Sequence, residues 1–216
     1  MAKRKIADNT ITIIVDEIGD PGLDTPDDPD FVMTASVVIQ PIQFSNISAK
    51  YRKLWKKSEL KSRYSTPEER DIVISDASEL DPKSNAVFIR KTSGDNPKWW
   101  RESKNRDTAY RETLSELMDD TFGSTADDGF IVVLDRHKAI TGGHGERIVE
   151  ESAKVKNKKV KKCYVEDSAA GERRDILQTN DFIPREAREI IRGEKETSKL
   201  NINIRRITSK NVRIKK

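Results

Sequence analysis

Four carboxylates in this sequence stand where folded elements end and can present side chains to a common site. Asp16 and Asp135 each follow a short apolar run. Glu59 comes at the end of a helical pattern, and Asp181 belongs to the last helical segment. Hard divalent cations prefer carboxylate oxygens, and two of them about 3.5 to 4 Å apart activate water in phosphodiester cleavage. If the fold gathers these four residues, we expect them to bind two Mg²⁺ or Mn²⁺ ions.

The first of these carboxylates lies in residues 10–22, T-I-T-I-I-V-D-E-I-G-D-P-G. The β-branched residues predict a strand that is buried near the middle of a sheet. Glycine and proline turn the backbone just after it, so Asp16 projects from a rigid strand end, with Glu17 and Asp20 close by as accessory groups. A half-buried carboxylate is costly unless a cation or donor meets it. The alternative is a solvated strand end with an acidic turn.

Residue types for other kinds of catalysis are scarce. His137 and His144 are the only histidines, and Cys163 is the only cysteine. A zinc cluster therefore lacks ligands, and no nucleophile-elbow motif supports a Ser-His-Asp triad. We retain His137 as an accessory group because it follows Asp135 by two residues.

Charge is unevenly distributed along the 216 residues, whose formal net charge is +4. Residues 16–30 hold seven acids and no base, 154–162 hold six lysines, and 192–216 hold nine bases against two acids. A basic margin beside an acidic centre suits a polyanion that is held by its phosphates over a metal site, so we expect nucleic acid as a partner. The contacts expected from the lysine run are Lys158, Lys159, Lys161 and Lys162. For any single basic run the alternative is a solvated face.

Composition and length favour one domain over residues 1–216, with a basic C-terminal tail at 208–216. Charged residues make up 36% of the chain against 34% hydrophobic ones, which predicts a narrow core under an ionic surface. No stretch approaches the roughly 18 apolar residues of a membrane span, and no signal-peptide pattern opens the sequence. With a single cysteine, these features predict a cytoplasmic protein without a membrane partner. They leave the oligomeric state open.

Strand and helix patterns alternate, which predicts an α/β fold. Strands are expected at residues 11–15, 31–40, 85–90, 129–134 and 160–165, with a late one at 201–207. Helices are expected from Ser45 to about Leu60, from Pro67 onward, through 110–118 with an end before Gly123, and over 146–156 and 174–192. A turn-rich loop favours antiparallel pairing of the first two strands. Pro184 should bend or restart the last helix just after Asp181.

Four segments of the chain together resemble the domain of unknown function 3800 family over nearly the whole length. They are I-I-V-D-E-I-G-D-P-G, S-E-L-K, I-V-V-L-D and D-S-A-A-G-E-R-R-D-I-L-Q-T-N-D-F-I. The family pattern is D-E-S-G-D at the opening, E-x-K in the middle and L-Q-x-A-D in the late helix. The matching residues are Asp16, Glu17, Gly19 and Asp20, then Glu59 and Lys61, then Leu177, Gln178 and Asp181. Ile18 stands where the family has serine, and Asn180 where it has alanine.

The resemblance implies a ribonuclease H-like α/β fold, in which helices flank a mixed sheet of about five strands, the first three antiparallel and the later ones parallel. It implies Asp16, Glu59, Asp135 and Asp181 as catalytic metal ligands. Lys61 and Gln178 join the accessory residues because they match the family motifs. The expected function is that of a metal-dependent nuclease or a related phosphodiester-processing enzyme.

Two other functions are compatible with the same residues. A non-catalytic module could keep this fold to bind nucleic acid or another partner. A phosphotransferase or nucleotide-processing enzyme could use the same acidic cluster. Cleavage or binding of nucleic acids, with Mn²⁺ and with a chelator, separates these readings.

Overall fold

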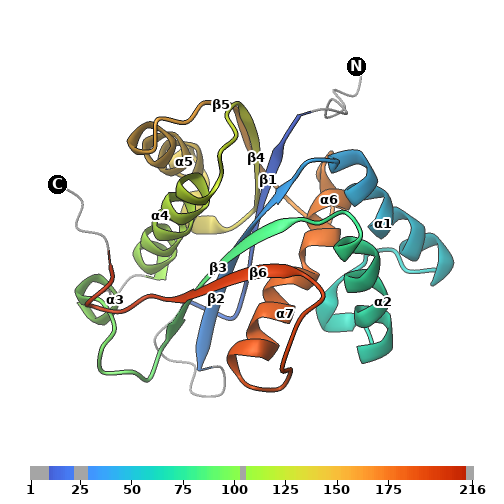
Figure 1. The fold of residues 1–216 in the computed structure, drawn as a ribbon, viewed down its shortest axis with the longest axis horizontal. Coiled ribbons are helices and arrows are strands. Elements are labelled where there is room, and N and C mark those ends of the chain that lie inside the picture. Colours follow the sequence, from blue (N-terminus) through green and yellow to red (C-terminus); the bar gives the residue numbers. More distant parts are fainter. Residues whose placement is uncertain (1–9, 22–28, 103–105, 213–216) are drawn as a thin grey trace.

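A mixed β-sheet lies at the centre of the fold (Figure 1). The structure is a computed structural model and describes residues 10–21, 29–102 and 106–212. Within these residues, six strands form the sheet in the order β5-β4-β1-β2-β3-β6. They are β1 (Thr12–Ile18), β2 (Asp30–Val38), β3 (Lys83–Arg90), β4 (Phe130–Asp135), β5 (Val160–Glu166) and β6 (Asn201–Arg206).

The strand directions divide the sheet into two parts. β1 pairs antiparallel with β2, and β2 pairs antiparallel with β3. β4 is parallel to β1, β5 is parallel to β4, and β6 is parallel to β3. The prediction of an α/β fold with an antiparallel start and parallel later strands is therefore confirmed, and the arrangement is consistent with a ribonuclease H-like fold. The late strand β6 brings the number in the described chain to six, against an expected five or so.

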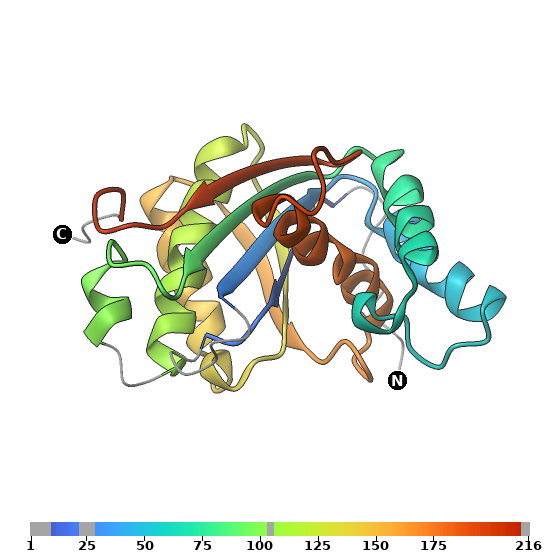
Figure 2. The same ribbon diagram turned by 90° about the horizontal axis from the view of Figure 1, so that it is seen from below.

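Helices cover both faces of the sheet (Figure 2). They are α1 (Pro41–Leu54), α2 (Pro67–Ser78), α3 (Lys98–Glu102), α4 (Arg106–Ser124), α5 (His144–Val155), α6 (Arg174–Asn180) and α7 (Phe182–Ile191), with 3-10 turns η1 (Ser62–Tyr64) and η2 (Lys138–Ile140). α4 and α5 pack on one face, whereas α1, α2, α6 and α7 lie on the other. The sheet is thus the middle of three layers.

β1 lies inside this sheet because its side chains are apolar on both faces. Ile13 and Val15 pack toward α4, and Ile14 packs toward α1 and α6. All three are at most 1% exposed. Burying one such aliphatic side chain contributes roughly 1.5–3 kcal/mol, so this part of β1 is rigid. The prediction that the strand stops at Asp16 is wrong, because pairing with β2 continues through Asp16 and Glu17 to Ile18.

Three helix boundaries differ from the prediction, and one of them is the end of α1, which lies at Leu54 and not near Leu60. α1 begins at Pro41 and not at Ser45, because proline suits the first helical turn, and the Ser45 hydroxyl bonds back to Ile42 O inside the helix. α4 runs through Gly123 to Ser124, because this glycine keeps a helical backbone. By contrast, α2 starts at Pro67 as predicted, where Thr66 and Glu69 form a capping box.

The last helical segment divides as predicted. α6 ends at Asn180, α7 starts at Phe182, and Asp181 stands at the junction. Pro184 lies in the first turn of α7, where its missing N–H costs no helical hydrogen bond. The break therefore leaves the Asp181 side chain between two helices that cover the sheet.

The sequence predicts a basic tail at 208–216. Residues 208–212 follow β6 as a turn, in which Val212 N donates to Thr208 O, and residues 213–216 lie outside the described residues. Among the helices of the described chain, none combines the length and apolar character needed to cross a membrane.

Candidate functional site

The carboxyl ends of β1 and β4 place two aspartates side by side. The strands are parallel neighbours, and Val15 pairs with Leu134 immediately before Asp16 and Asp135. Since side chains alternate along a strand, both aspartates point to the face that carries α6, opposite to Val15 and Leu134. The register of one strand pair thus joins two residues that are far apart in sequence.

Asp16 is almost completely buried, at 3% exposed. Its Oδ1 accepts a hydrogen bond from Glu17 N at 2.8 Å, but its buried Oδ2 has no partner among the described residues. Burial, followed by the charges of Asp135 and Asp181, raises the pKa of the Asp16 carboxyl well above its usual value. A buried carboxylate oxygen without a donor calls for a cation or a proton.

A lysine ammonium stands among the carboxylates. Lys61 Nζ lies 3.6 Å from Asp181 Oδ1 and 3.9 Å from both Glu59 Oε1 and Asp135 Oδ2. It donates a hydrogen bond of 2.6 Å to Ser168 Oγ. Lys61 thus lies within 4 Å of three of the four predicted ligands, and the charge of the fourth, Asp16, also acts on it.

Backbone hydrogen bonds hold the segment that carries Lys61. Leu60 N donates to Gln178 Oε1 at 3.1 Å, and Ser62 N donates to Asp181 Oδ2 at 2.6 Å. One residue on each side of Lys61 is thus bound to the late helices.

Ser168 connects this segment to β4. Its N–H donates to Asp135 Oδ1 at 3.1 Å, and its carbonyl accepts from Gln178 Nε2 at 2.8 Å. Arg136 N gives Asp135 Oδ1 a second hydrogen bond at 2.9 Å. Gln178 is fully buried. The oxygen of its side-chain amide binds the Leu60 loop and the nitrogen binds the Ser168 loop, so the amide joins the two loops. This network orients Asp135 and positions Lys61.

The charges of the site oppose one another. Burial raises the pKa of Asp135, against the lowering effects of Lys61 and of the hydrogen bonds from Ser168. Burial alone would lower the pKa of the Lys61 ammonium, but the surrounding carboxylates, led by Asp181, raise it above its usual value. The lysine therefore stays charged and partly neutralises the cluster.

The donor set suits Mg²⁺ or Mn²⁺, because it consists of carboxylate oxygens and includes the unpartnered Asp16 Oδ2. Within residues 10–21, 29–102 and 106–212, however, no three His, Cys, Asp or Glu side chains stand ready to hold a metal ion. The ammonium of Lys61 fills the space between them. The residue types fit a metal, whereas their present spacing fits an ammonium.

Glu17 belongs to the opposite face of the sheet. Its Oε2 accepts a hydrogen bond of 2.8 Å from the hydroxyl of Tyr110 in α4. Burial raises the pKa of Glu17 to about 7, although this hydrogen bond lowers it. His137 stacks on the Tyr110 ring, with centroids 4.0 Å apart and planes 3° apart. Glu17 and His137 are therefore linked through Tyr110 on the α4 side of the sheet, although the charges of Asp135 and Asp181 also raise the pKa of Glu17.

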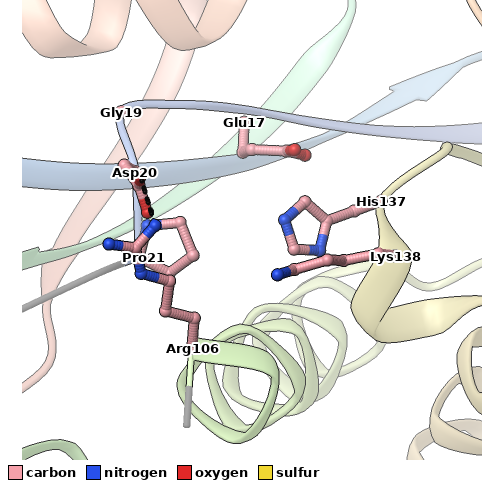
Figure 3. A pocket seen from close by; sticks show the side chains of 7 residues that line it. All are labelled: Glu17, Gly19, Asp20, Pro21, Arg106, His137 and Lys138. Carbon is pink, nitrogen blue, oxygen red and sulfur yellow. Dashed lines mark hydrogen bonds and ion pairs between the residues drawn. The ribbon is translucent and has the colours of Figure 1, made fainter.

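A hollow of about 310 Å³ adjoins this group, and Figure 3 shows Glu17 and His137 directed toward it. Arg106 and Asp20 form an ion pair at 3.2 Å on its wall. His137 Nδ1 accepts from Ala139 N at 3.1 Å, so the neutral ring carries its proton on Nε2. Burial lowers the pKa of His137, which favours this neutral form.

The predicted nucleic-acid lysines lie elsewhere. Lys158 and Lys159 precede β5, and Lys161 and Lys162 are near its start. Lys162 pairs with Ile131, whereas Asp135 pairs with Glu166 at the other end of the strand. Four residues of strand correspond to about 13 Å, so the structure does not bring the lysine run to the carboxylates.

Sequence reasoning missed two residues of the site. Ser168 reads in the sequence only as the residue after a strand, and Tyr110 only as part of an apolar helix stripe. β5 is parallel to β4 and ends at the same edge of the sheet, beside Asp135. The position of Ser168 just after β5 was therefore the sequence signal that could have identified it. The Tyr110 contact with Glu17 depends on how α4 packs and had no local signal.

No protein-family model matches the chain, and a search of curated proteins finds no match.

Proposed function

We propose that the protein is a divalent-metal-dependent hydrolase that cleaves phosphodiester bonds in nucleic acid. The observation that carries this proposal is the buried Asp16 Oδ2, which has no hydrogen-bond partner among the described residues. The Asp16 carboxyl is also close enough to Asp135 and Asp181 for their charges to raise its pKa. A buried carboxylate in this state is matched to a cation. Glu59 adds a fourth oxygen-bearing side chain across Lys61.

Each carboxylate has a role in the proposed reaction. Asp16 would bridge two ions, Asp135 and Asp181 would each hold one, and Glu59 would hold an ion or orient water. Bound Mg²⁺ or Mn²⁺ supplies water activation and stabilises charge on the leaving oxygen. Ser168 and the backbone N–H of Ser62 would orient Asp135 and Asp181.

Two exposed arginines support a nucleic-acid substrate. Arg63 follows Ser62, which binds Asp181, and Arg136 follows Asp135 directly. Phosphate contacts by arginine fix the position of a strand without reading its sequence. Arg136 is thus adjacent in sequence to one of the four carboxylates, and Arg63 is adjacent to a residue that binds another, whereas the lysine run at the start of β5 is not.

A second function is supported by Lys61. Its ammonium already meets three carboxylates, so the cluster is partly neutralised without metal. That favours a non-catalytic module that binds nucleic acid or another partner. The two functions differ in whether Mn²⁺ changes the state of the nucleic acid.

The test is incubation of purified protein with labelled single-stranded RNA, single-stranded DNA, both duplexes and the hybrid, with Mn²⁺ or with a chelator. Metal-dependent products support the hydrolase, and mobility shifts without products support the module. Asp181→Asn should abolish cleavage, since asparagine can still accept from Ser62 N but is a poor metal ligand. Asp167→Asn is the control, because Asp167 is exposed and bonds to Ala169 N outside the cluster. Full metal-dependent cleavage by Asp181→Asn would disprove the assigned site.

A further inference from the structure

Lys61 is held in the carboxylate cluster by charge and by one hydrogen bond. Its distances to Asp181, Glu59 and Asp135 are 3.6, 3.9 and 3.9 Å, all longer than a hydrogen bond. Among the described residues, Ser168 Oγ, at 2.6 Å, is the one hydrogen-bond partner of Nζ. The ammonium therefore occupies the centre of the cluster without a directional bond to any carboxylate.

The backbone around this side chain is fixed independently. Leu60 N is bound by Gln178, and Ser62 N is bound by Asp181. The Lys61 side chain has a flexible four-carbon stem and can change rotamer while these backbone contacts persist. Any movement of the ammonium can thus be confined to one side chain.

An ammonium and a metal ion compete for the same space. A Mg²⁺ ion requires oxygen ligands at about 2.0–2.1 Å, so carboxylate oxygens that now lie 3.6–3.9 Å from Lys61 Nζ must close around the ion. A divalent ion there would also repel the ammonium. The presence of Lys61 explains why no ready metal group exists in the described part of the chain, although the ligand types are present.

We propose that Lys61 is an exchangeable counter-ion, which neutralises the carboxylate cluster in metal-free protein and leaves the centre when a divalent ion enters. This inference rests on the proposed metal-dependent function. In this role Lys61 does not bind the metal. Metal loading instead replaces the single positive charge of its ammonium with the double charge of the divalent ion. The cluster is never left without a cation.

The direct test is lysine labelling, which reports where the ammonium is. Native protein is treated briefly with an amine-acylating reagent, in chelator and in Mn²⁺, and labelling of each lysine is quantified by peptide mass spectrometry. Lys57 is the internal control, because it is 24% exposed and pairs with Glu69 outside the cluster, whereas Lys61 is 11% exposed. We expect Mn²⁺ to raise Lys61 labelling several-fold and to leave Lys57 labelling unchanged.

Binding of Mn²⁺ is measured separately, from the shift in melting temperature with Mn²⁺ concentration. If Mn²⁺ saturates this shift while Lys61 stays protected, the exchange is disproved and the metal site stands. If Mn²⁺ produces no shift, the proposed metal-dependent function fails and the exchange fails with it. If Lys61 becomes labelled but no nucleic acid is cleaved, the exchange stands and the hydrolase does not.

A variant gives a second measurement. Lys61→Met keeps the length of the side chain and removes its charge. In chelator it should melt below the parent, because the carboxylates lose their cation. Its half-saturating Mn²⁺ concentration should fall at least about tenfold, since no ammonium must be displaced. An unchanged or higher half-saturating concentration would contradict the exchange.

Discussion

Replacing the buried Gln178 by leucine should destabilise the protein strongly, because two loops lose their common partner. Gln178 accepts from Leu60 N at 3.1 Å and donates to Ser168 O at 2.8 Å. Leucine is similar in size but leaves both backbone groups without this partner in a site that excludes water. An orphaned buried polar group costs about 1–3 kcal/mol, so Gln178→Leu should lower the free energy of unfolding by about 2–6 kcal/mol.

Guanidinium denaturation followed by tryptophan fluorescence measures this change. Gln43→Leu is the matched control, because Gln43 is exposed on α1 and the same substitution there should change stability by less than about 0.5 kcal/mol. A loss below about 1 kcal/mol for Gln178→Leu would mean that its two hydrogen bonds do not join the loops as described.

The same variant should bind metal less well. Leu60 precedes Lys61, and Ser168 orients Asp135, so loosening both segments disorders two sides of the cluster. The gain in melting temperature from Mn²⁺ should therefore be smaller for Gln178→Leu than for the parent. An equal gain would show that the carboxylates are positioned without Gln178.

Three further predictions follow from the charges. Asp135→Asn in chelator at neutral pH should be about 1–2 kcal/mol more stable than the parent, because the raised pKa of Asp135 means that folding disfavours its ionised carboxylate. Mn²⁺ should reverse the order of the two melting temperatures. A variant that is less stable than the parent in chelator and gains as much from Mn²⁺ would refute this. Cys163 should react slowly with iodoacetamide at pH 8 in folded protein and rapidly in urea, because burial and the nearby Glu146 and Glu150 raise its pKa to about 12; rapid alkylation of native protein would contradict this. Replacing four lysines with glutamine should flatten the salt dependence of nucleic-acid binding only if they contact phosphates, and an unchanged slope would make the run a solvated face. Those four are Lys158, Lys159, Lys161 and Lys162.

Local patterns in the sequence were sufficient for the buried strands, for the end of β4 and for the helix break. The β-branched run before Asp16 predicts the buried strand, but not its end, because β1 continues through Asp16 and Glu17 to Ile18 in register with β2. Pro184 predicts the break at Asp181, because the ring tolerates only the first turn of a helix. Each of these features depends on a few adjacent residues.

The tertiary structure alone decided which charges meet. Asp16 and Glu17 are adjacent in sequence, but strand alternation sends them to opposite faces, one to Lys61 and the other to Tyr110. The register of β4 with β5 puts the lysine run at the far end of the strand from Asp135.

Tertiary packing also determines that the Lys61 ammonium lies among the carboxylates. Local patterns placed Asp135 at the end of a strand and Asp181 at a helix break, whereas Asp16 lies within β1 and Glu59 in the loop after α1. That the ammonium of Lys61 stands among them follows from hydrogen bonds between loops more than 100 residues apart in sequence. Such contacts form only when the sheet register and the helix packing are complete, so no local pattern contains them.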